Sequence, residues 1–419
     1  MNILKTLFPF LAIIGCTTYA QEFEANVQLR PRFEYRNGYK SLLKDGDIPA
    51  SFISQRSRLN LNFTQDKLKL KLALQNISVW GDVATTSTAA KNGVAVFEAW
   101  AEYSFTDKWS SRIGRQVLNY DNQRIMGGID WIQQGQSHDA VLLTYKDTKN
   151  QLDLGVAHNA NAENLLAPTT AYTTNYKNMH YAWYHTKIST INASFLFLNT
   201  GYEFAATPTE LKVDYKQTYG TYLTYKGKKL DFDFGLYGQS GKSAGNDITA
   251  FYAGSNIGYA LTENFKATLG YEFLSGKDQD DTSTKLKSFI PLFGTNHAFN
   301  GFMDYFYVGN HSNNVGLQDA YLKLEFPIKK VKLSVTPHFF YAHSKVIVST
   351  VEQDSYLGTE LDLTAAYKVS KDILVVGGYS QMFGTTTLEA LKGGDSSKTN
   401  NWAWLMININ PNIFSTKKQ

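Results

Sequence analysis

Short polar breaks recur along the chain, and they constrain its fold more than any other feature of the sequence. Eight of them, mostly at intervals of about 40 residues, are flanked by segments in which apolar and polar residues alternate. They lie at residues 64–67, 106–108, 147–150, 187–190, 226–229, 261–264, 327–330 and 369–372. A longer polar segment separates each break from the next. This arrangement is typical of hairpins in an antiparallel transmembrane β-barrel, with short turns at one end and long loops at the other.

The number and pattern of the strands define the fold class. Eight short turns join sixteen strands, and one further strand at each end, residues 22–36 and 402–410, brings the count to about 18. In the first of these, Phe23, Ala25 and Val27 alternate with polar residues. A soluble β-sandwich alternates in the same way, but long strands in so many copies exceed what two packed sheets usually hold. We therefore predict an all-β fold: one transmembrane antiparallel up-and-down β-barrel over residues 21–419.

The N-terminus resembles a secretory signal. Lys5 precedes an apolar stretch over residues 7–16 and a small-residue site that ends at Ala20, so we predict a signal peptide at residues 1–20. A lipoprotein box ending at Cys16 is the alternative. Since Cys16 is the single cysteine, no intrachain disulfide is expected. A signal followed by a barrel predicts the outer membrane of a Gram-negative bacterium, with lipid around the wall. Aromatic residues near the short turns, such as Tyr103 and Trp109, predict an interfacial girdle.

The arginines carry the functional information. The whole chain has a formal net charge of only +4, so nothing indicates a nucleic-acid partner, yet every arginine lies between residues 30 and 124. Alternation with apolar neighbours directs most of them into the lumen. Guanidinium groups bind carboxylate and sulfate-like oxygens through paired hydrogen bonds, so this basic wall predicts anionic solutes. The candidate pore-lining residues are Arg30, Arg32, Arg36, Arg56, Arg58, Lys69, Lys71, Arg112, Arg115, Arg124, Asp130 and Trp131.

The basic wall has a second interpretation. Luminal acids lie close by in the sequence and could pair with the arginines, leaving a salt-bridge lattice that only stiffens the wall; they are Glu24, Glu34, Glu98 and Glu102. Arg124 with Asp130 could pin the loop of about twenty residues that holds both.

The longest predicted loop, residues 276–316, is rich in aromatic side chains. Because so much apolar surface is seldom left exposed, we expect this loop to fold into the barrel mouth as a constriction. The alternative is an external loop packed on its neighbours. The candidate constriction residues are Phe289, Phe293, Asn296, His297, Phe299, Asn300 and Asp304.

Two motifs resemble a known family. The first comprises Gly114-Arg115-Gln116, Tyr120, Arg124, Gly128, Asp130-Trp131, Gly135 and His138-Asp139; the second is FIPLFGTNHAFNGFMD at residues 289–304, followed by Gly316, Leu317 and Asp319. Both are similar to segments of the alginate-export outer-membrane porins. The resemblance implies an 18-stranded monomeric barrel with an electropositive, anion-selective lumen. The near-neutral total charge and the lack of arginine after residue 124 depart from that pattern.

The sequence therefore predicts a passive channel for anionic, oligosaccharide or polysaccharide solutes. Export and uptake need the same pore, and the alternative function is a general diffusion porin for nutrient uptake. Ser137, His138 and Asp139 could suggest a membrane-embedded hydrolase, but no nucleophile elbow surrounds them, so we predict no enzyme. No cofactor is expected. Three loop carboxylates could hold Ca²⁺; they are Asp278, Asp280 and Asp281.

Overall fold

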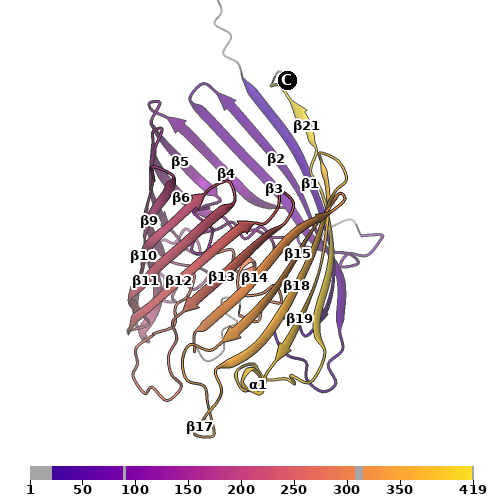
Figure 1. The fold of residues 1–419 in the computed structure, drawn as a ribbon. Coiled ribbons are helices and arrows are strands. Elements are labelled where there is room, and N and C mark those ends of the chain that lie inside the picture. Colours follow the sequence, from indigo (N-terminus) through magenta and orange to yellow (C-terminus); the bar gives the residue numbers. More distant parts are fainter. Residues whose placement is uncertain (1–20, 88–90, 307–314, 418–419) are drawn as a thin grey trace, which may run out of the picture.

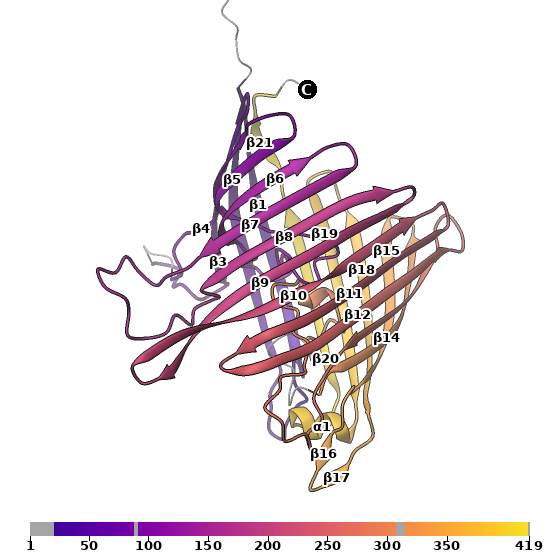
Figure 2. The ribbon, with the colours of Figure 1, turned by 90° about the vertical axis from the view of Figure 1, so that its left-hand side faces the viewer.

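Eighteen antiparallel strands close into a barrel within residues 21–87, 91–306 and 315–417, which the computed structural model describes (Figures 1 and 2). The predicted signal peptide at residues 1–20 lies outside these ranges. The strands are β1 (Glu22–Asn37), β2 (Ala50–Gln65), β3 (Leu68–Val79), β4 (Ala95–Ser104), β5 (Trp109–Gln116), β6 (His138–Lys146), β7 (Asn150–His158), β8 (Asn178–Ile188), β9 (Ile191–Thr207), β10 (Glu210–Lys226), β11 (Leu230–Ser243), β12 (Asn246–Ala260), β13 (Lys266–Leu274), β14 (Leu317–Ile328), β15 (Val331–Tyr341), β18 (Tyr356–Lys368), β19 (Ile373–Gly384) and β20 (Asn400–Ile409).

The first and last strands close the ring. β1 pairs with β20 between Leu29↔Ile409 and Asn37↔Asn401, and nearer its own N-terminal end with the short strand β21 (Asn412–Ser415). Pro411 separates β20 from β21, because proline has no N–H to donate to the ladder. The closed ring leaves no unpaired edge strand along the seam.

The eight polar breaks are all short turns, as predicted, and they gather at the upper end of the barrel in Figure 1. We assign this end to the periplasm because short turns mark that side of outer-membrane barrels. The expectation of a longer loop after every hairpin is wrong at two places. Two-residue turns also join β9 to β10 and β11 to β12 at the extracellular end. In the second, Ala244 and Gly245 both have positive φ, the geometry of a type I′ hairpin turn.

The outer face is apolar. Outward-pointing side chains such as Phe195, Phe251 and Leu269 are half exposed or more, as expected of a wall that contacts lipid. Near the short turns, aromatic rings contact their neighbours: the ring centroids of Trp109 and Tyr145 lie 5.0 Å apart. These rings occupy the position of the predicted girdle.

Small elements cover the extracellular end. They are the hairpin β16 (Ile347–Val348) with β17 (Val351–Glu352), and helix α1 (Thr386–Lys392), both at the lower end of Figure 1. Thr385 caps α1 by accepting a hydrogen bond from the Leu388 amide, which satisfies one of the free N–H groups of the first turn. Within the described residues no helix has the length and apolar character needed to cross a membrane.

The buried apolar side chains lie inside the barrel and not between two sheets. Met126, Met303 and Tyr305 of the long loops are almost completely buried, and so are Phe340 and Trp402 of the wall. Loops and wall therefore pack against one another within the lumen, and this packing positions the site described next.

Candidate functional site

The loop between β5 and β6, here called the first inner loop (residues 117–137), lies against the basic wall. Arg30 donates to the Asp130 and Ile132 carbonyl oxygens at 2.7 and 3.0 Å. Arg32 donates to the Trp131 carbonyl at 2.7 Å, and Arg56 forms an ion pair with the Asp130 carboxylate at 2.8 Å. A loop inside a barrel needs donors for its backbone carbonyls, and here arginine side chains supply them.

Four predicted pore-lining arginines therefore point inward but lie beneath this loop. Arg30, Arg32 and Arg56 are at most 4% exposed and Arg58 is 8% exposed. Arg58 donates to Gln75 and lies 3.7 Å above the Phe97 ring. This corrects their assignment as pore-lining residues: the alternation predicts their direction, but it carries no information on what covers them.

The loop between β13 and β14 contains the second inner loop (residues 289–306), which lies against acids of the opposite wall. Glu360 accepts a hydrogen bond from the Met303 amide at 2.7 Å, and Asp362 accepts one from the Phe302 amide at 3.2 Å. Gly301, which directly precedes Phe302, has φ +80°, and a Cβ there would lie 2.7 Å from the Glu360 carboxylate. Sequence reasoning missed these acids, although their alternation with Leu361 and Leu363 places both in the lumen.

The two inner loops bind each other across the lumen. The Gly127 amide donates to the Phe293 carbonyl at 2.8 Å, and the Thr295 amide donates to Gln123 at 2.8 Å. Arg124 crosses from the first loop to the second. Its guanidinium contacts Glu272, Asn300 and Asn296 at 2.9, 2.7 and 3.2 Å. The predicted Arg124–Asp130 pair is therefore wrong, because Asp130 lies with Arg30 and Arg56 and Arg124 lies with Glu272.

Trp131 and His297 form the central contact between the two loops. Their rings are stacked, with centroids 4.3 Å apart and planes 11° from parallel, and the Arg32 guanidinium lies 4.1 Å from the Trp131 ring centre. His297 also contacts Asp304 at 2.8 Å. Tyr39 donates to the same carboxylate, and burial followed by the charge of Asp304 raises the pKa of Tyr39.

The remaining predicted constriction residues lie in the buried core or contact the other inner loop. Phe289 and Phe293 are buried in the core, and Phe299 lies beneath the Arg124 guanidinium at 4.5 Å. The two inner loops thus form a partition across the barrel interior.

The exposed part of the basic wall is partly neutralised. Arg112 and Lys69 share Glu102 at 2.6 and 3.2 Å, Lys71 pairs with Glu98, and Arg36 pairs with Glu34 at 2.8 Å.

Arg115, in contrast, lies outside the lumen. It follows the lipid-facing Ile113 by two positions and pairs with Asp139 at 2.8 Å on the outer face. Its assignment to the pore is therefore wrong, since residues two apart on a strand share a face.

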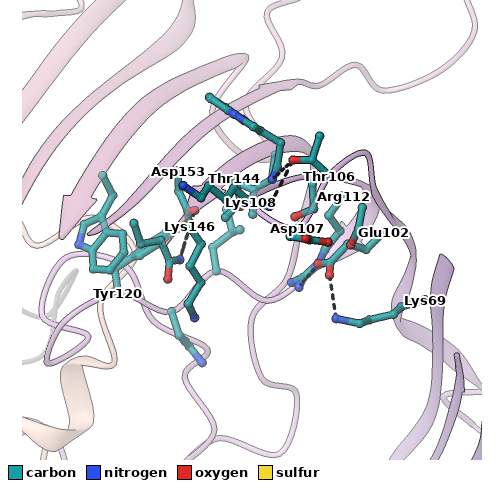
Figure 3. Close-up of a pocket in the computed structure, with 18 of the residues that line it drawn as sticks. Lys69, Glu102, Thr106, Asp107, Lys108, Arg112, Tyr120, Thr144, Lys146 and Asp153 are labelled. Atoms are coloured by element: carbon teal, nitrogen blue, oxygen red, sulfur yellow. Dashed lines mark hydrogen bonds and ion pairs between the residues drawn. The ribbon is translucent and has the colours of Figure 1, made fainter. Parts of the chain in front are cut away.

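A pocket of about 450 Å³ lies between the periplasmic turns and the underside of the first inner loop (Figure 3). Lys69, Glu102 and Arg112 line one side, and Tyr120, which donates to Asp153 at 3.0 Å, lines the other. Lys108 and Lys146 also line it, are exposed, and form no ion pair with a described residue. The sequence reasoning overlooked both; alternation along β6 would have placed Lys146 in the lumen.

A second pocket, of about 650 Å³, lies under the second inner loop on the opposite wall. Its carboxylates outnumber its lysines, and its lining includes Asp231, Asp233, Glu272 and Glu325 together with Lys266 and Lys323. The periplasmic half of the lumen therefore has a more basic side and a more acidic side.

The other candidate chemistries find little geometric support. His138 is buried against Tyr176, whereas Asp139 is exposed on the outer face, so the two side chains point to opposite sides of the wall. In the loop carboxylates, Asp281 pairs with Lys287 at 2.8 Å and Asp280 with Lys345 at 3.8 Å. Among the described residues no cluster of three or more His, Cys, Asp or Glu side chains suits a metal ion. Calcium binding at the loop stays a prediction.

Comparisons with known proteins agree with this architecture. A family model described as alginate export matches residues 24–401. Similar solved structures include OccK11 (OpdR) of Pseudomonas aeruginosa, at 13% identity and a TM-score of 0.62, covering 94% of this chain and 96% of that one. OccAB1 of Acinetobacter baumannii is 13% identical over 94% and 97% of the two chains, with a TM-score of 0.61. The outer membrane protein OprD of P. aeruginosa is 14% identical over 93% and 94%, with a TM-score of 0.61. A comparison with curated proteins finds no match.

Proposed function

This chain belongs to the alginate export family, and we propose that it is a passive channel for small carboxylated or sugar-like solutes. It is a porin-type barrel of the Gram-negative outer membrane. The proposal concerns its solutes and the luminal groups that bind them.

The pocket under the first inner loop is the observation that carries the proposal. Lys69, Lys108, Arg112 and Lys146 face Glu102, Asp107 and Asp153 in its lining, which leaves one positive charge in excess. Asp153 already accepts a hydrogen bond from the Tyr120 hydroxyl, whereas Lys108 and Lys146 are exposed. A carboxylate entering this pocket would meet the exposed ammonium groups of Lys108 and Lys146, which form no ion pair with a described residue.

The balance of charge keeps binding weak, as a channel requires. Lys69 and Arg112 are shared with Glu102, so a solute competes with an internal partner for each of them. A site that binds a passing solute too tightly would hold it and stop transport. The pocket therefore suits solutes with one or a few carboxylates better than a dense polyanion.

Electrophysiology tests this function. Reversal potentials in a salt gradient across planar bilayers measure ion preference, and block of the current by a uronic-acid oligomer measures binding. We expect Arg112→Gln combined with Lys146→Gln to shift preference toward cations. Block should weaken by on the order of tenfold, since a charged hydrogen bond contributes roughly 1.5–3 kcal/mol. The shift should shrink at about 1 M salt, where the Debye length falls to roughly 3 Å.

Lys323→Gln is the matched control, because Lys323 is a luminal lysine of the opposite wall. It should leave block by the oligomer unchanged. If the double variant keeps the parent's selectivity and block at low salt, the pocket does not select solutes. A general diffusion porin, which the many internal ion pairs of the wall would suit, would then be the better description.

We also propose that the barrel acts as a monomer exported by its predicted signal peptide. β1 and β20 close the ring within one chain, so the lumen is complete without a second copy.

A further inference from the structure

The barrel wall opens between β6 and β7 near its extracellular end. These strands pair only from Val141↔Val156 to Lys146↔Gln151. β6 nevertheless continues to His138 in its ladder with β5, and β7 continues to His158 in its ladder with β8. From Val141 and Val156 toward the extracellular end, the two strands thus continue without a ladder between them.

An outward-facing groove of about 600 Å³ lies at this opening, which belongs to the wall that faces the viewer in Figure 2. Its periplasmic part is apolar: Ile113, Val141 and Val156 are 59%, 39% and 50% exposed. Its extracellular part is polar and is lined by Asp139, Asn178, His158 and His180. The groove is therefore amphipathic along its length.

Arg115 places a cation at the polar end. It pairs with Asp139 at 2.8 Å, and both side chains are partly exposed, at 40% and 59%. The preceding Gly114 has φ +120°, and a Cβ there would lie 2.3 Å from the Ala99 carbonyl oxygen, so only glycine fits this close approach.

One polar atom on this outer face has no partner. Arg115 Nε is buried without a hydrogen bond to any described residue. β5, β6 and β7 have only 8, 9 and 9 residues, at or below the roughly 9–11 that a transmembrane strand needs, so their polar ends lie at the boundary of the hydrocarbon. An unpaired polar group at that depth costs free energy, so we expect a polar group of a lipid to pair with it.

We propose that this groove binds lipopolysaccharide, with a lipid A phosphate at Arg115, His158 and His180 and an acyl chain along Ile113, Val141 and Val156. A guanidinium pairs well with phosphate oxygens, and imidazole N–H groups can donate to them. Asp139, beside Arg115, meets the phosphate through a divalent cation, since both supply the hard oxygen ligands that Mg²⁺ and Ca²⁺ prefer. The groove, unlike the luminal pocket, faces the membrane, so this inference does not depend on the proposed solute.

The test measures lipid binding to the full barrel in detergent with Mg²⁺, by native mass spectrometry. Lipid A should bind the parent more tightly than dephosphorylated lipid A or phosphatidylglycerol does. Arg115→Gln with His158→Gln should weaken lipid A binding by on the order of tenfold, the loss expected for a charged hydrogen bond. Val156→Trp, which fills the apolar part, should weaken binding of lipid A with and without phosphate.

Arg112→Gln is the control: it removes a positive charge from the same strand but on the luminal face. It should leave lipid A binding unchanged, and circular dichroism with unheated gel mobility should show all variants folded. Equal affinity of the parent and the Arg115→Gln, His158→Gln variant would overturn the proposal. So would phosphatidylglycerol binding as tightly as lipid A, because the site would then not select lipid A.

Discussion

At the scale of single residues, charged side chains in the lumen form hydrogen bonds with the backbone of the two inner loops. Arginines of β1 and β2 donate to carbonyl oxygens of the first inner loop, whereas Glu360 and Asp362 accept from amides of the second. Strand alternation was sufficient to predict that the arginines of β1 and β2 point inward, whereas the outward-facing Arg115 was wrongly assigned to the pore. Their burial depends on carbonyls about 100 residues away in the sequence, such as that of Asp130 against Arg30, and no local pattern encodes such a contact.

Gly301 tests how tightly the second inner loop is held. Its φ of +80° and the Glu360 carboxylate 2.7 Å from an added Cβ both require glycine. We expect Gly301→Ala to displace the loop from Glu360 and raise single-channel conductance.

Gly46→Ala provides the control for backbone strain alone. Gly46 has a similar φ of +83°, but nothing lies within 4 Å of an added Cβ. It should cost about 1 kcal/mol of local strain or slightly more and leave the conductance unchanged. Equal conductance changes in both variants would mean that the Glu360 contact does not position the loop.

At the scale of elements, the turns were predictable and the inner loops only in part. Each polar break corresponds to a short turn because the period-two alternation stops there on both sides. The extracellular turn at Ala244 and Gly245 was missed, since polar residues continue along both faces of β11 and β12 beyond the membrane. The inward fold of the aromatic loop followed from its composition, whereas its backbone pairing with residues 123–127 did not.

The partition predicts the effect of removing the second inner loop. Replacing residues 289–306 by a short Gly/Ser linker should raise single-channel conductance severalfold, because the loop crosses the lumen and contributes nothing to the strand ladder. Removing the contacts of Phe293 and Thr295 should also loosen residues 123–127 of the first inner loop, while arginines of β1 still bind residues 130–132. Its cleavage by added protease should then rise.

A replacement of residues 80–87 by a linker of equal length serves as the control, since that segment lies in the loop between β3 and β4 and lines neither luminal pocket. It should keep the parent's conductance. A parent-like current through the barrel without residues 289–306 would place the narrowest part of the pore outside the partition.

At the scale of the whole molecule, charge is sorted around the lumen. The luminal arginines occupy β1, β2 and β5 with the first inner loop, where the buried Glu34 and Glu98 pair with basic side chains. Four other buried acids occupy β13, β14 and β18: Glu272, Asp319, Glu360 and Asp362. The total charge of +4 hides this separation, because the two sides nearly cancel. Sequence order alone indicated the basic side, since neighbouring strands in the chain are neighbours in the barrel. The sequence analysis did not identify the acidic side, which was recognised from the hydrogen bonds that its carboxylates accept from amides of the second inner loop.

Orientation in the membrane follows from the two ends of the same strand. β10 begins after the turn that contains Thr209 and ends before the turn that contains Lys228, and both side chains are exposed. If the end with eight short turns faces the periplasm, a membrane-impermeant thiol reagent should label Thr209→Cys in intact cells. It should label Lys228→Cys only after the outer membrane is permeabilised. The parent chain is the control for Cys16, which lies in the predicted signal peptide. Because both turns are short, loop length cannot explain a difference between them, and labelling of Lys228→Cys in sealed cells would reverse the assignment of the two ends.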